Sequence, residues 1–178
     1  MTEGEATRQV GVARPITRYL DPLLHRPCAT VISFDEGLAA LIEDMFASMY
    51  AAEGVGLAAN QIGVDARVFV YDIADPETAE RHVGHVVNPV LRAPKGRGHR
   101  EVDAEGCLSV PGQYADLARA DIATVNGVDR TGSPVRVAGT GLLARCLQHE
   151  VDHLNGVVYV DLLSRRRRAA ILAAAGLS

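Results

Sequence analysis

The segment QHEVDHLNG, residues 148–156, constrains the fold of this chain more than any other. It places Glu150 directly after His149 and a second histidine, His153, three residues further on, in the spacing H-E-x-x-H. On a helix, both imidazoles then lie one turn apart on the same face and can bind one metal ion, with the glutamate beside them as a base. The same letters also fit two histidines and a glutamate on a partly exposed helix. A third ligand is needed to decide between the two interpretations.

The residues around this motif predict a helix from about residue 140 to 155, ended by Gly156. Two neighbouring stripes of this helix carry mostly apolar side chains and are expected to be buried. One stripe holds Leu142, Cys146, His149 and His153, and the other holds Leu143, Leu147, Glu150 and Leu154. Buried ionisable groups are costly unless they are paired or bound to metal, which favours the metal interpretation.

The remaining pattern predicts a mixture of helices and strands. Apolar residues spaced three and four apart predict an amphipathic helix between Phe34 and Gly54. The strands are expected at residues 66–73, 85–92, 120–128 and 134–139, and residues 91–100 are expected to form a loop or a hairpin tip. Residues 1–13 are expected to form a loose N-terminal tail or a strand arm, and residues 164–178 a C-terminal helix. Residues 1–178 are expected to form a single catalytic domain.

Composition narrows the functional class. A formal charge of -4 gives no overall basic field for nucleic acid, and no apolar run is long enough to span a membrane. The N-terminus has no apolar region of the kind found in secretory signals. Cys28, Cys107 and Cys146 cannot all pair, and without an export signal we expect them to be reduced, in the cytoplasm.

The search for a third ligand points upstream. One metalloprotease pattern would need a histidine where this chain has Tyr159. Another uses a glutamate roughly twenty residues downstream of the motif, but the only acid after His153 is Asp161. Upstream, EGCLS (105–109) offers Cys107 in a loop beside a glycine. One thiolate and two imidazoles leave a fourth position open for water, which is the catalytic arrangement. A free cysteine is more often a small buried apolar residue, but the polar surroundings here weigh against that.

A third segment, GVGLAANQIG (54–63), alternates glycine with apolar residues. Such an edge lets a peptide approach the backbone closely and pair with it. The amide of Gln61, close by in the sequence, could stabilise a developing oxyanion. Taken alone, the segment is a loop and the start of a strand.

Together, GVGLAANQ, EGCLS and QHEVDHLNG, in this order, resemble the peptide deformylase family across roughly residues 14–163. The resemblance implies an α+β fold in which a central helix carries HExxH among mostly antiparallel strands, with helices near both ends. The implied metal ligands are Cys107, His149 and His153. The implied catalytic groups are Glu150 as general acid and base, with Gln61 and the backbone N–H of Leu108 as oxyanion donors. The substrate is expected to lie against Gly54, Val55, Gly56, Leu142 and Cys146, and Glu105 and Arg119 to form an ion pair behind the ligands.

The resemblance further implies hydrolysis of the formyl group of N-formylmethionyl peptides, with release of formate. The ion is expected to be Fe(II), one per chain, which Zn(II) or Ni(II) can replace. One position departs from the family pattern: Tyr114 stands where many members carry an arginine that contacts the substrate backbone. We therefore expect recognition of the substrate downstream of methionine to differ here. The arginines at 165–168 fit either ribosomal RNA or a solvated basic face.

Two other functional classes remain open on the sequence alone. A zinc-dependent protease or amidase of another kind lacks a third ligand downstream of His153. The other class is a metal-stabilised binding module or an inactive relative. Structural zinc sites usually have four protein ligands, whereas only three are found here, and this class would leave Glu150 and Gln61 without a role.

Overall fold

The computed structural model describes residues 10–178, except residue 77 and residues 95–99. Its helices are α1 (Glu36–Ala51), α2 (Gly141–Leu154) and α3 (Arg165–Ala174), with short 3₁₀ turns at Pro22–His25, Ala59–Ile62 and Tyr159–Leu162. The strands are β1 (Gly56–Ala58), β2 (Val68–Ala74), β3 (Arg81–Arg92), β4 (Arg100–Cys107), β5 (Val110–Ala120), β6 (Ile122–Val128) and β7 (Pro134–Thr140).

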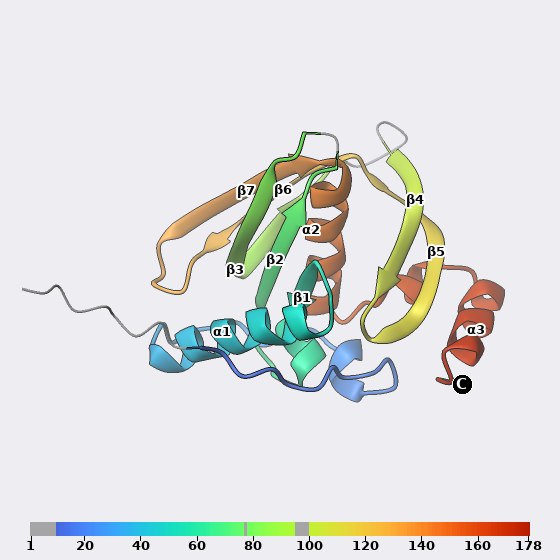
Figure 1. Cartoon of the computed structure of the whole chain (residues 1–178), viewed down its shortest axis with the longest axis horizontal. Coiled ribbons are helices and arrows are strands. Elements are labelled where there is room, and N and C mark those ends of the chain that lie inside the picture. Colours follow the sequence, from blue (N-terminus) through green and yellow to red (C-terminus); the bar gives the residue numbers. More distant parts are fainter. Residues whose placement is uncertain (1–9, 77, 95–99) are drawn as a thin grey trace, which may run out of the picture.

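Two antiparallel sheets flank the central helix α2. One sheet has the order β1-β2-β3-β6-β7, and the other is the two-stranded ribbon of β4 and β5. Figure 1 shows α2 between them, with α1 below the larger sheet and α3 beside β5. The predicted α+β fold with a central HExxH helix is therefore confirmed. No helix in the described part of the chain is long and apolar enough to cross a membrane.

The helix boundaries follow from local chemistry. The Asp35 side chain accepts a hydrogen bond from the Leu38 N–H and caps α1, and Ser164 caps α3 in the same way. The chain leaves α2 through Gly156 at a φ of 81°, where a side chain would collide with the backbone of Arg26. All three helices form where the sequence predicts them.

The ribbon of β4 and β5 corrects the sequence-based prediction. Residues 105–109 were expected to form a loop, but Glu105 and Cys107 lie on β4, which pairs with β5. The first five residues of β4 are exposed, so the strand carries no alternation of apolar and polar residues that a sequence could reveal. Of the loop expected at 91–100, Leu91 and Arg92 belong to β3 and Arg100 to β4, and residues 95–99 lie outside the described residues.

The N-terminal tail is only partly described. Residues 1–9 lie outside the described residues, but Val12 donates its N–H to Asp44 on α1 at 2.7 Å. A side chain at Gly11 would collide with the carbonyl of Glu43, so this segment lies directly against the helix. The segment expected to be loose is thus attached from residue 11 on, because backbone hydrogen bonds to a helix side chain cannot be read from composition.

Candidate active site and metal centre

Helix α2 brings the two histidines of the motif together. The Nε2 atoms of His149 and His153 lie 3.1 Å apart, and the two rings meet edge to face. His153 is fully buried, and His149 is 9% exposed. This proximity follows from the helical spacing of four residues.

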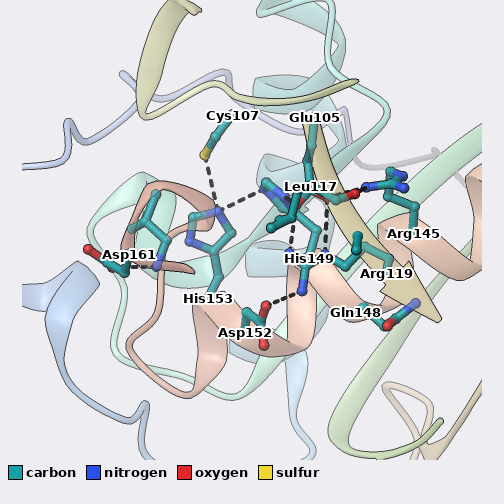
Figure 2. Close-up of polar contacts among 12 residues, drawn as sticks. Glu105, Cys107, Leu117, Arg119, Arg145, Gln148, His149, Asp152, His153 and Asp161 are labelled. Atoms are coloured by element: carbon teal, nitrogen blue, oxygen red, sulfur yellow. Dashed lines mark hydrogen bonds and ion pairs between the residues drawn. The ribbon is translucent and has the colours of Figure 1, made fainter. Parts of the chain in front are cut away.

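Cys107 completes a cluster of three potential ligands. It is the last residue of β4, at an irregularity in the pairing with β5 between Gly106 and Cys107. Its Sγ lies 3.2 Å from Nε2 of His153 (Figure 2). The ligand atoms of the three residues all lie within 4.8 Å of one another. Strand β4 and helix α2 thus contribute one and two potential ligands to the same point.

The cluster fits a metal ion in chemistry as well as in position. Nδ1 of His149 contacts Oε1 of Glu105 at 2.7 Å, so that its Nε2 faces the cluster. Such a carboxylate partner fixes the tautomer and orientation of a metal-binding imidazole. Burial lowers the pKa of His153 well below its usual value and keeps the ring neutral, which is the form that binds metal. Three protein donors leave room for a water molecule or a substrate atom.

A buried ion-pair network, centred on Glu105, contacts His149 through its Nδ1 atom. The Glu105 carboxylate accepts two hydrogen bonds from Arg119, at 2.6 and 3.0 Å, and one from Arg145 at 2.9 Å. Burial by itself would raise the pKa of Glu105, but hydrogen bonds from His149 and Arg119 outweigh it and hold the pKa well below its usual range. Arg119 also contacts Asp152 (Figure 2).

Arg145 was not identified from the sequence. Its guanidinium donates to Glu105 and to the main-chain oxygens of Glu101 on β4 and Leu117 on β5. It therefore joins α2 to both strands of the ribbon that carries Cys107. Its position four residues before His149, on the same helix face, could have indicated this role, since a buried charged residue there needs hydrogen-bonding partners.

Other contributions to the site were also missed. Gln148 donates to and accepts from the backbone of Ala120, which ties α2 to the end of β5. The ring of Tyr159 stacks beside His149, with ring centroids 6.4 Å apart. Ala120 is 28 residues from Gln148, and Tyr159 follows α2 after a turn, so no spacing rule predicts either contact.

Glu150 lies against β1 and lines the same cavity as Cys107 and His149. A Cβ on Gly56 would lie 2.5 Å from its Oε1, so the glycine makes room for the carboxyl group. Burial raises the pKa of Glu150 to about 7. Its Oε2 has no hydrogen-bond partner among the described residues. A buried carboxyl group with a pKa near neutrality and an unengaged oxygen is suited to accept and release a proton.

The amide of Gln61 is held in one orientation. Its Oε1 accepts from the N–H of Ala58 at 3.0 Å, and its Nε2 lies 3.5 Å from Sγ of Cys107 and 3.2 Å from Oγ of Ser109. The donor end of the amide thus faces the ligand cluster. Leu108, which follows Cys107, packs its side chain where a Cβ of Gly54 would stand.

A cavity of about 620 Å³ opens beside these groups. Most residues predicted for the site line it: Gly54, Val55, Gly56, Gln61, Glu105, Cys107, Leu108, Leu142, Cys146, His149 and Glu150. His153 and Arg119 lie behind this lining. The helix stripe that contains Leu142 was expected to be buried, but Leu142 is 44% exposed and lines the cavity.

The alternative ligand downstream lies elsewhere. Asp161 accepts hydrogen bonds from Tyr19 and from the N–H of Val158, and pairs with Arg168. It is not part of the ligand cluster found among the described residues.

Comparisons with known proteins agree on one family. The model of the polypeptide deformylase family matches residues 13–169. Peptide deformylase 1 of Streptomyces avermitilis is 56% identical over 164 residues, which cover 92% of this chain and 76% of that protein. Peptide deformylase 2 of Streptomyces coelicolor is 53% identical over 172 residues, covering 97% and 94%.

Solved structures are similar over nearly the whole chain. The peptide deformylase of Legionella pneumophila superposes with a TM-score of 0.82 at 44% identity, covering 93% of this chain and 94% of that one. The peptide deformylase of Ehrlichia chaffeensis in complex with actinonin gives 0.83 at 34% identity, covering 92% and 95%.

Proposed function

The chain belongs to the polypeptide deformylase family, and from that premise we propose that Cys107, His149 and His153 hold the metal ion on which its activity depends. The enzyme removes the N-formyl group from the N-terminal methionine of nascent polypeptides and releases formate. The observation that carries the proposal is the convergence of one thiol and two imidazoles within 4.8 Å, beside a cavity that Glu150 also lines.

The ion we propose is Fe(II), one per chain, with Zn(II) or Ni(II) as substitutes. When bound, it supplies a Lewis acid that lowers the pKa of water to near neutrality. Thiolate and imidazole ligands would also suit zinc, so ligand type alone does not select iron.

Each protein group near the metal then has a separate role in the reaction. Glu150 accepts a proton at its carboxylate from the water that attacks the formyl carbon. The formyl oxygen gains negative charge and accepts hydrogen bonds from Nε2 of Gln61 and the backbone N–H of Leu108. Glu150 returns the proton to the leaving nitrogen, the carbon–nitrogen bond breaks, and formate and a free amino terminus result.

The substrate is proposed to lie along β1. Its backbone would follow Gly54, Val55 and Gly56, whose small size allows close approach. The methionine side chain would occupy the cavity against Leu142 and Cys146. Glu105 and Arg119 would not touch substrate but would keep His149 and the end of β4 in register.

The decisive experiment is an assay of formate release from formyl-Met-Ala-Ser, combined with metal analysis of anaerobically purified protein. We expect turnover and close to one metal ion per chain. Absence of formate release from fully metal-loaded protein would contradict the proposed site.

We also propose that residues 1–178 form a single catalytic domain acting in the cytoplasm, where formylated chains emerge from ribosomes. Arg165 and Arg166, both exposed on α3, would contact ribosomal RNA. Deleting α3 is a poor test, because Leu177 is buried among core residues. Charge reversal of both arginines should reduce co-sedimentation with ribosomes at low salt, whereas reversal of the exposed Arg136 on β7 should not. Equal co-sedimentation of all three proteins would contradict ribosome binding by α3.

A further inference from the structure

A second depression lies next to the active-site cavity, between the ribbon of β4 and β5 and helix α3. It measures about 450 Å³ and is lined by Ala104, Tyr114, Ala115, Asp116, Arg167, Ala170 and Ile171. Ala104 and Tyr114 also line the active-site cavity. The two hollows therefore adjoin at these two residues. Figure 1 shows α3 beside β5, where this groove lies.

The side wall of the groove is one face of the ribbon. Gly106 pairs with Tyr114, and Ala104 pairs with Asp116, so these four residues share a face. A Cβ on Gly106 would lie 2.5 Å from the ring of Tyr114, which shows that the ring lies across the glycine. Tyr114 is nevertheless 72% exposed. It therefore presents an uncovered aromatic surface between the cavity and the groove.

The other wall is formed by one face of α3. Arg167, Ala170 and Ile171 lie three and four residues apart and so project to the same side. The guanidinium of Arg167 donates to the main-chain oxygen of Asp116 at 3.2 Å and bridges to the ribbon. The small side chain of Ala170 leaves the groove open.

We propose that this groove binds the residues of the formylated chain that lie downstream of methionine, after the chain has crossed Tyr114. The inference rests on the proposed function, because it takes the formyl group to lie at the metal cluster. A chain that leaves the cavity over Tyr114 meets the groove next. Tyr114 and Asp116 are two residues apart on one strand face, roughly 7 Å, so the groove holds about two residues of an extended peptide.

Substrate length provides the first test. The wild-type enzyme should act on formyl-Met-Ala-Ser-Ala-Ala-Ala-Ala amide with a kcat/KM roughly three- to tenfold above that for formyl-Met-Ala-Ser amide, the gain given by shallow, exposed contacts. Ala170→Trp fills the groove and should abolish this gain. Ala169→Trp, at an exposed position of α3 outside the groove lining, should keep it. All three proteins should treat the tripeptide alike.

The outcomes separate the two proposals. Failure to deformylate the tripeptide would contradict the proposed function. Normal tripeptide turnover without a length effect, or equal losses in both tryptophan variants, would overturn the groove. Weaker ribosome co-sedimentation of Ala170→Trp with unchanged peptide kinetics would also overturn it, because the occupant would then be the ribosome.

Charge provides an independent test. Two oppositely charged side chains, Asp116 and Arg167, line the groove. Arg167→Glu should therefore shift the ratio of kcat/KM for a substrate with an acidic residue at the groove over one with a lysine there toward lysine, by roughly two- to fivefold at low salt, as for an exposed ion pair. Arg136→Glu, with the same charge change at an exposed position of β7, should leave this ratio unchanged. Identical behaviour of the two variants would indicate a diffuse field rather than a binding groove.

Discussion

At the scale of single residues, burial determines what the acidic groups of the site can do. Glu105 and Glu150 are both almost fully buried, yet their pKa values move in opposite directions. Glu105 accepts hydrogen bonds from two guanidinium groups and contacts an imidazole, which hold it ionised. Among the described residues no guanidinium or imidazole is hydrogen-bonded to Glu150, and burial raises its pKa to about 7. The first is suited to hold a ligand and the second to move a proton.

Replacing the proposed proton carrier should separate binding from chemistry. We expect Glu150→Gln to retain the metal, because the side chain is not among the three proposed ligands, and to lower kcat by roughly 10²–10⁴-fold. Formate release and metal content should be measured on the same sample. Turnover close to that of the wild type would exclude Glu150 as the base.

The pH dependence should report the same group. Glu150 acts as a base only when deprotonated, so kcat/KM should fall as pH drops below its pKa. That pKa is about 7 without a metal ion, and a nearby divalent charge lowers it, so the midpoint should lie at or below pH 7. The residual activity of Glu150→Gln should lack this acid limb. An identical limb in that variant would assign it to another group.

The amide of Gln61 can be tested by an apolar residue of similar size. Gln61→Leu removes the Nε2 donor that faces Cys107 and should lower kcat by roughly 10²–10³-fold, as loss of an oxyanion donor does. KM and the thermal midpoint should be determined alongside. An unchanged kcat would assign Gln61 a structural role in holding Ala58.

At the scale of elements, the site depends on the joint between α2 and the ribbon of β4 and β5. Two potential ligands lie on the helix and one lies on the ribbon. The distance from the Cys107 sulfur to the two imidazoles therefore depends on how rigidly the helix packs against the ribbon. Gln148 and Arg145 reach from the helix to the ribbon, and Arg119 reaches from the ribbon to Asp152 on the helix. These contacts are buried or nearly so, where each lost partner leaves a polar group unsatisfied.

Loosening the joint should weaken the hold on the metal. Arg145→Met removes the contacts to Glu101, Glu105 and Leu117, and should increase the metal dissociation constant by roughly 10–100-fold, as outer-shell changes do. Arg100→Met, which removes an exposed contact on the same ribbon, is the matched control. Chelator competition with the Co(II)-loaded proteins, followed through the thiolate absorption band, gives the readout. Equal dissociation constants for the two variants would show that Arg145 does not position the ligands.

At the scale of the whole molecule, two sheets enclose one helix, and the cavity opens between β1 on one side and the ribbon on the other. Cys107 and His149, two of the proposed ligands, line this cavity, whereas His153 is fully buried and is not part of its lining. Small molecules such as dioxygen can reach a thiol that lines a cavity of this size.

That accessibility leads to a prediction about the metal forms. Iron-loaded protein should be most active without oxygen and should lose activity in air, because the iron or Cys107 is oxidised. Zinc- or nickel-loaded protein should keep its activity in air, with zinc the weaker catalyst. Formate release followed over time, with and without oxygen, distinguishes the forms. Equal rates and lifetimes for the iron and zinc proteins would leave the iron assignment without functional meaning.

The sequence by itself determined the parts of this protein that depend on neighbours along the chain. The turn of α2 brings His149 and His153 together, and the caps and glycines set the helix ends. Three short segments were enough to indicate the cysteine, the amide and the glycine-rich strand. These features follow from periodicity and residue chemistry, which a sequence displays directly.

Only the tertiary structure decided which distant groups share a contact. The exposed ribbon of β4 lacks a period-two apolar pattern, so its pairing could not be predicted. The contacts of Arg145 and the groove beside α3 join segments that are far apart in the sequence. The stacking of Tyr159 on His149 joins two nearby segments whose contact the sequence does not reveal. The pKa of Glu150 likewise depends on what covers it. Burial and partner choice are properties of packing, and packing is fixed only when all the elements meet.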